Sequence, residues 1–167
     1  MKNAGEIHSF DLHENKLSLV SNGAEKLGIS IIKTDARDGR IFDEKLENYA
    51  DKIICDVPCS GFGVMAKKPE IRYKDPKESA GLPQIQYDIL CNSARYLKVG
   101  GILVYSTCSL LPEENQLNVE KFLAAHKSFE PCDFNIGNIT SQNGMLTLNP
   151  HDHGTDGFFI AKLRKVN

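Results

Sequence analysis

The stretch DKIICDVPCSGFGVM, residues 51–65, holds a short apolar run that ends abruptly. Residues 53–55 form a run typical of a buried β-strand, and Asp56 follows them directly. Because Pro58 and the glycines after it disfavour a strand, the chain is expected to leave the sheet there in a turn. Cys59 lies within that turn, and its thiol is a buried packing group, a metal ligand or a part of an active site.

Strands and helices alternate along the chain on both sides of this stretch. Gly28 and the Gly100–Gly101 pair end two helical patterns, and Pro112 with two acidic residues begins a third. This alternation of helices with nearly continuous apolar strands predicts an α/β fold, with helices covering both faces of a parallel sheet. The expected strands are residues 5–12, 29–35, 51–58 and 101–109, with further candidates at 144–150 and 157–165, and the expected helices are 14–29, 82–101 and 111–126.

The composition is that of a soluble globular protein with one domain and no visible linker. The chain has 167 residues, 41% hydrophobic residues and a formal net charge of −2. That charge argues against a stand-alone electrostatic binder of nucleic acid, but not against an enzyme with a local basic groove. No apolar run approaches a membrane span, and the first residues lack a signal-peptide pattern. Five cysteines without a Cys-x-x-Cys pair favour reduced thiols and a cytoplasmic location.

Acidic residues and cysteines follow the expected strands where each strand ends. In a parallel α/β sheet the ligand binds beyond the carboxyl ends of the strands, so these side chains are expected to meet at one site. Asp11 and Asp35 are placed to accept hydrogen bonds from a ribose or an adenine amino group, or else to cap a helix or a turn. Asp56, Cys59 and Cys108 end the next two strands along the chain.

The two cysteines in the turns PCSG and STCS have two interpretations. Free cysteine is most often a small buried hydrophobe, and Cys55, inside the apolar run, is expected to be one. Cys59 and Cys108 lie just past their strands, where hydroxyl and backbone N–H groups can lower the pKa of a thiol. His151 and His153 have a spacing that suits zinc, but no cysteine pair stands beside them, so no metal site is predicted.

A basic segment, AKKPEIRYK, follows the Cys59 turn. The segment supplies Lys67, Lys68, Arg72 and Lys74, which are expected either in a solvated loop or against an RNA backbone, with the first three as the candidate RNA contacts. Tyr73 lies among them and is suited to stacking on a base.

Four stretches resemble the Sun-type family of RNA cytosine-5 methyltransferases, and most of all its bacterial branch that acts on small-subunit ribosomal RNA. They are GEIHSFDLHENKLSLVSNGAEKLGI, DVPCSGFGVMAKKPEIRYK, VYSTCSLLPEEN and HGTDGFFIAKL. The resemblance covers essentially the whole chain and implies a Rossmann-like class I methyltransferase sheet, mostly parallel with an antiparallel C-terminal strand. It also implies S-adenosylmethionine as methyl donor and RNA as partner.

The resemblance assigns a role to each candidate residue. Asp11 would hold the ribose hydroxyls of S-adenosylmethionine, and Asp35 its adenine, with Asp38 a weaker candidate. Asp56 would lie near the sulfonium and the target cytosine. Cys108 would be the nucleophile and Cys59 the thiol that assists product release.

The family's glycine-rich cofactor loop and the central strand before it would precede Met1, and no such loop occurs in these residues. Residues 1–167 are therefore expected to form a partial catalytic domain that is inactive by itself and binds S-adenosylmethionine weakly or not at all. Open sheet edges are expected to favour a homodimer. Three alternatives stay open: a catalytically dead RNA-binding module, a transfer RNA methyltransferase, and an unrelated thiol enzyme or zinc protein.

Overall fold

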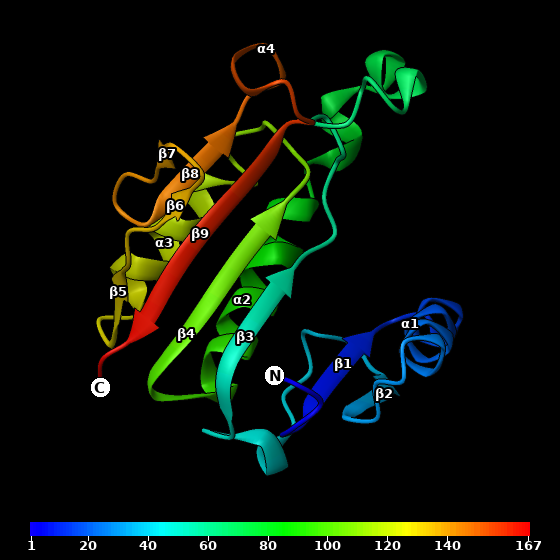
Figure 1. Cartoon of the computed structure of the whole chain (residues 1–167). Helices are drawn as coiled ribbons and strands as arrows, with labels where there is room; N and C mark the ends of the chain where they lie inside the picture. Colours follow the sequence, from blue (N-terminus) through cyan, green and yellow to red (C-terminus); the bar gives the residue numbers. More distant parts are fainter. The chain divides into compact units, whose positions relative to one another are not determined.

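The computed structural model describes residues 1–167, which divide into two compact units, residues 1–42 and 43–167 (Figure 1). No helix has the length and apolar character that crossing a membrane requires.

The first unit is a strand–helix–strand motif. Strands β1 (Ile7–Asp11) and β2 (Ile32–Ala36) pair in parallel, and helix α1 (Glu14–Lys26) connects them. Leu17 and Ala24 are the buried side chains of α1. Gly28 follows the helix with φ of 65°, a conformation that glycine adopts without strain. The three predicted elements of this unit are confirmed.

The second unit is built on a mixed sheet, with strand order β3-β4-β9-β5 and β8 paired to β9 (Figure 1). β3 and β4 are parallel, whereas β9 runs antiparallel to β4, to β5 and to β8. The predicted parallel pairing and the predicted antiparallel C-terminal strand are therefore both confirmed. The strands are β3 (Ala50–Asp56), β4 (Leu97–Thr107), β5 (Phe129–Pro131), β8 (Met145–Leu148) and β9 (Phe158–Lys165).

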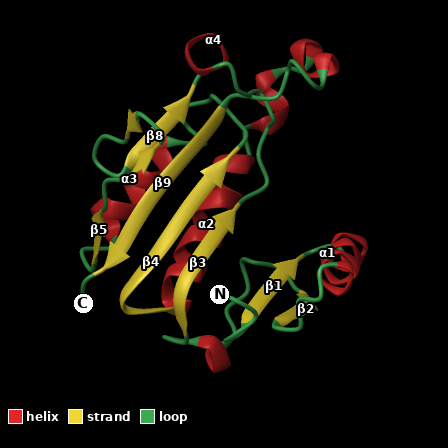
Figure 2. Cartoon of the chain, in the orientation of Figure 1, coloured by secondary structure: helices red, strands yellow, loops and turns green.

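Helices α2 (Leu82–Tyr96) and α3 (Gln116–Ala125) cover one face of this sheet (Figure 2). Their buried side chains, Leu90 and Phe122 among them, form one core with Leu103 and Tyr105 of β4. On the other face of the sheet, Ile54 of β3 is 81% exposed, so within this unit the helical cover is one-sided. The remaining elements are η1 (Glu44–Leu46), η2 (Pro69–Tyr73), η3 (Pro76–Ser79), β6 (Asn135–Ile136), β7 (Ile139–Thr140) and α4 (Pro150–His153).

Two predicted helix boundaries are wrong. The helix predicted over residues 82–101 ends at Tyr96, because Leu97 is fully buried and pairs with Ala50 as the first residue of β4. The helix predicted over residues 111–126 begins at Gln116 rather than at Pro112. The four residues before it form a turn, and the side chains of Glu114 and Asn115 in that turn are buried in the site described next.

Candidate active site

Three loops of the second unit meet beyond the carboxyl ends of β3 and β4. The parallel register places Asp56 beside Ser106, so the chain leaves both strands at the same edge. The Gly63 N–H donates to the carbonyl of Cys108 at 2.9 Å, and the Gly157 N–H donates to the carbonyl of Gly63 at 2.7 Å. These backbone hydrogen bonds join the PCSG loop, the STCS turn and the segment before β9 into one structure.

The two cysteines of these loops touch. Cys59 Sγ lies 2.7 Å from Cys108 Sγ, and the backbone N–H of Cys108 donates to Cys59 Sγ at 3.3 Å. Both residues are half-buried free thiols. Burial, then the hydrogen bond with Cys108 and the charge on that residue, raises the pKa of the Cys59 thiol well above its usual range. A raised pKa favours the protonated form of the Cys59 thiol at neutral pH.

Cys55 has no part in this arrangement. Its side chain is 4% exposed and belongs to the core, where burial raises the pKa of the thiol to about 12. The prediction that Cys55 packs in the core is confirmed.

Asp56 stands at the end of β3 with its carboxylate exposed. The hydroxyl of Ser106 donates to Asp56 Oδ1 at 3.0 Å across the β3–β4 pair. This bond fixes the carboxylate at the strand ends and leaves its second oxygen free to accept from a ligand.

A buried carboxylate, which the sequence reasoning missed, lies behind the two cysteine loops. Glu114 is 1% exposed and accepts hydrogen bonds from the Ser60 N–H at 2.9 Å, from the Ser109 hydroxyl at 2.8 Å and from Gln86 Nε2 at 2.8 Å. The Ser60 hydroxyl also contacts it. The available signal was the serine that follows the cysteine in both PCSG and STCS, since two buried hydroxyls need acceptors.

Gly63 has no room for a side chain. A Cβ atom there would lie 2.0 Å from the carbonyl oxygen of Gly157 and 2.8 Å from that of Cys108. Gly63→Ala is therefore expected to push the three loops apart and to lower the free energy of unfolding by about 1–3 kcal/mol, the usual cost of overpacking. Urea unfolding measures this change in the free energy of unfolding. Gly81→Ala is the control, because a Cβ at Gly81 meets nothing within 4 Å. Equal stability of the two variants would contradict the close packing.

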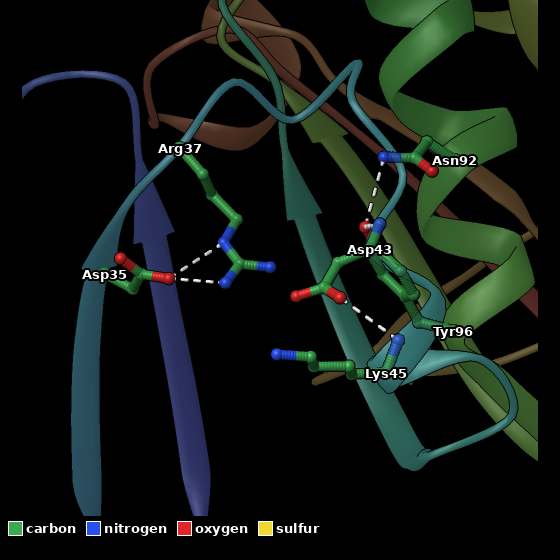
Figure 3. Close-up of polar contacts among 6 residues, drawn as sticks. All are labelled: Asp35, Arg37, Asp43, Lys45, Asn92 and Tyr96. Atoms are coloured by element: carbon green, nitrogen blue, oxygen red, sulfur yellow. Dashed lines mark hydrogen bonds and ion pairs between the residues drawn. The ribbon is translucent and has the colours of Figure 1, made fainter.

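The predicted cofactor residues Asp11 and Asp35 lie in the first unit, on neighbouring strands. Asp11 accepts from the His13 N–H at 2.9 Å and lies 3.4 Å from Lys16 Nζ. Asp35 accepts from Arg37 Nε at 3.1 Å, as Figure 3 shows.

Asp38, the weaker candidate, is held by Arg40 through side-chain and backbone hydrogen bonds, which lower the pKa of the carboxyl to about 2. In the second unit, Asp43 caps η1 by accepting from the Lys45 N–H, and its own N–H donates to Tyr96 Oη at 3.0 Å (Figure 3).

The predicted RNA-binding residues are exposed on the segment that follows the PCSG loop. Lys67 pairs with Asp156, while Lys68 and Arg72 point to solvent beside Tyr73, which is 88% exposed. Lys74, the next basic residue, reaches back toward the carbonyl of Ser60, 3.4 Å from its Nζ. The basic segment is thus connected to the cysteine loop by a direct contact.

His151 and His153, whose spacing suits zinc, bond to different partners. His153 Nδ1 bonds to the backbone of Asn149, and His151 Nε2 lies 3.0 Å from Asp152 Oδ1.

The sequence of the chain matches a known family. A family model described as 16S rRNA methyltransferase RsmB/F matches residues 1–164. The chain belongs to this family. The resemblance in the four quoted stretches is thereby confirmed.

Several RNA methyltransferases match nearly all of this chain. The probable ribosomal RNA small subunit methyltransferase B of Bacillus subtilis is 42% identical over 99% of this chain and 39% of its own length. The tRNA (cytosine(72)-C(5))-methyltransferase of Pyrococcus horikoshii is 36% identical over 99% of this chain and 42% of its own length. NSun6 from Pyrococcus horikoshii, solved with SFG, superposes with a TM-score of 0.83 at 34% identity, over 99% of this chain and 43% of that one. The chain spans about two-fifths of the length of the curated relatives it matches.

Proposed function

We propose that the full-length gene product transfers a methyl group from S-adenosylmethionine to carbon 5 of a cytosine in small-subunit ribosomal RNA. The observation that carries the proposal is the direct contact between the sulfurs of Cys59 and Cys108 beyond the strand ends. Membership of the RsmB/F family supports RNA methylation, and identity to a small-subunit methyltransferase B supports the ribosomal substrate. The five free cysteines support a cytoplasmic location.

The two thiols suit chemistry on a ring carbon that is a weak nucleophile. Addition of the Cys108 thiolate to carbon 6 of cytosine forms a sulfur–carbon bond and makes carbon 5 electron-rich. S-adenosylmethionine supplies the electrophilic methyl group on its sulfonium, which carbon 5 accepts. A base then removes the proton from carbon 5, the double bond re-forms, and the electron pair of the sulfur–carbon bond returns to Cys108. Cys59, at contact distance from that sulfur, is placed to take part in this last step.

Asp56 is proposed to hold the target ring. Its free carboxylate oxygen, at the end of β3, accepts a hydrogen bond from a protonated ring nitrogen or from the exocyclic amine and so stabilises the adduct. The target cytosine must be unpaired or flipped out to reach the thiols. Lys67, Lys68 and Arg72 are proposed to contact the RNA backbone next to the site, and Tyr73 to stack on a base.

Asp11 and Asp35 fit the methyl donor by their chemistry. Both are carboxylates at the carboxyl ends of neighbouring parallel strands, where acceptors suit ribose hydroxyls and an adenine amino group. Because no glycine-rich loop occurs in these residues, the isolated chain is expected to bind S-adenosylmethionine weakly or not at all. Isothermal calorimetry tests this expectation, and micromolar affinity of the isolated chain would contradict it.

A homodimer of the isolated chain is also proposed. β3 stands at one end of the sheet order, so its outer edge carries unpaired backbone groups, and the side chain of its own residue Ile54 is exposed. Light scattering is expected to find a dimer that Ile54→Lys weakens by placing a charge on the edge strand. A monodisperse monomer at every concentration would contradict the proposal.

The function is tested by incubating the full-length protein with methyl-labelled S-adenosylmethionine and either small-subunit ribosomal RNA or transfer RNA, followed by base-resolution detection of 5-methylcytosine. The proposal expects label in the ribosomal RNA at a cytosine. Label only in transfer RNA would favour the alternative substrate that the Pyrococcus horikoshii relative suggests. RNA binding without any methylation would favour a catalytically dead binding module.

A further inference from the structure

The side chain of Glu114 is a buried carboxylate with no cation among its hydrogen-bond partners. Its contacts are with the Ser60 N–H and hydroxyl, the Ser109 hydroxyl and Gln86 Nε2. Its own carbonyl accepts from the Tyr105 hydroxyl at 2.6 Å, which fixes the backbone as well. Burying a carboxylate is costly unless hydrogen bonds replace water, and here both oxygens are bonded by neutral donors.

The donors to this carboxylate come from two different loops. Ser60 follows Cys59 in the PCSG loop, and Ser109 follows Cys108 in the STCS turn. The two hydroxyls also lie 3.0 Å from each other. Gln86, which is fully buried in α2, donates from the same amide nitrogen to the carbonyl of Pro58 at 2.8 Å.

A neighbouring residue fixes the turn that carries the carboxylate. Asn115 accepts from the Thr107 hydroxyl, and its amide donates to the carbonyl of Ser109 at 2.9 Å. The turn of residues 112–115 therefore wraps the STCS turn instead of opening the helix at Pro112.

We propose that Glu114 is a positioning residue that holds the two cysteine loops in register, so that Cys59 Sγ and Cys108 Sγ meet at one point. The role in catalysis rests on the proposed function, whereas the contact between the two sulfur atoms is a feature of the structure. Neither thiol is a hydrogen-bond partner of Glu114. The carboxylate acts through Ser60 and Ser109, the serines that follow the two cysteines.

The test measures how fast the two thiols find each other. The oxidant diamide joins Cys59 and Cys108 as a disulfide: the two thiols lose two protons and two electrons, and diamide is reduced to its hydrazine. Glu114→Gln is expected to slow this closure about tenfold, because the amide presents N–H groups to donors that are already buried and so displaces a loop. Glu113→Gln removes the same charge one residue away, at an exposed position, and is expected to change closure by less than about twofold.

Two further measurements separate positioning from other roles. The rate at which iodoacetamide alkylates each thiol corrects the rate of disulfide formation for differences in thiol reactivity. In the full-length protein, Glu114→Gln is expected to lower kcat while leaving KM for RNA unchanged. If the Cys59–Cys108 disulfide forms in Glu114→Gln at the same rate as in Glu113→Gln, the inference is overturned. If Glu114→Gln does not fold by circular dichroism, Ser109→Ala decides: it detaches one loop only, and unchanged closure would overturn the inference.

Failure of the proposed function has a different signature. A full-length wild-type protein that methylates no RNA, while its Glu114→Gln variant still closes the disulfide slowly, would overturn the function and leave the positioning role of Glu114 standing.

Discussion

Full-length protein carrying Cys108→Ala is expected to lose methyl transfer by at least about 1,000-fold, since a covalent route has no substitute for its nucleophile. Carbon 5 of cytosine becomes nucleophilic only after a thiolate has added to carbon 6, and no other sulfur is placed to do so when Cys59 keeps its proton. The same variant is expected to form no covalent complex with RNA containing 5-fluorocytosine. That base traps the adduct because carbon 5 then carries fluorine in place of the hydrogen that a base must remove as a proton before the sulfur–carbon bond can break.

Denaturing gel electrophoresis of labelled RNA measures the adduct, and label transfer measures turnover. Cys132→Ala is the matched control, because Cys132 is another half-buried free thiol, near Arg164 and away from both cysteine loops. It is expected to keep both activities. A trapped complex that persists in Cys108→Ala, at wild-type yield, would show that another residue adds to the ring.

Cys59→Ala is expected to have the opposite effect on the covalent complex. Under the proposed mechanism the variant is expected still to add Cys108 to carbon 6, and carbon 5 to accept the methyl group, but the thiol proposed to assist release is missing. Covalent protein–RNA complex is therefore expected to accumulate with ordinary, unfluorinated RNA, and turnover to fall about 100-fold, the lower range for loss of a general base.

The pKa of Cys59 gives this prediction a pH dependence. Burial and the neighbouring Cys108 sulfur both raise the pKa of Cys59. Bonding Cys108 to carbon would remove the contribution of the second sulfur and leave burial, so the pKa of Cys59 is expected to fall in the adduct while it stays raised. Wild-type release is therefore expected to quicken as pH rises above neutral, because more Cys59 is deprotonated, whereas release by Cys59→Ala stays flat. A parallel rise in the two proteins would exclude Cys59 as the base.

Much of the candidate site could be predicted from the sequence because strand ends obey a simple geometric rule. The turns after residues 51–58 and 101–109 follow parallel neighbours, and such neighbours release the chain at one edge of the sheet. Cys59 and Cys108 were therefore predicted to meet, and the structure places their sulfurs in contact.

The rest depended on side-chain partners that only the folded chain brings together. Pro112 followed by two acids has the local pattern of a helix start, but Glu114 is used by two serines that lie 5 and 54 residues away. Periodicity alone assigns no role to Gln86 on α2, yet its side chain is fully buried and its amide donates to Pro58 and Glu114. Leu97 fits the helical spacing of α2, yet pairing with Ala50 makes it a strand residue.

Mild oxidation of the purified chain, followed by peptide mass spectrometry, tests the central claim most directly. If the sulfur atoms of Cys59 and Cys108 share one point in space, diamide will yield a single predominant crosslinked peptide pair, joining these two residues with the loss of two hydrogens. Recovery of both residues as separately alkylated peptides, or linked to Cys91 or Cys132 instead, would contradict the account.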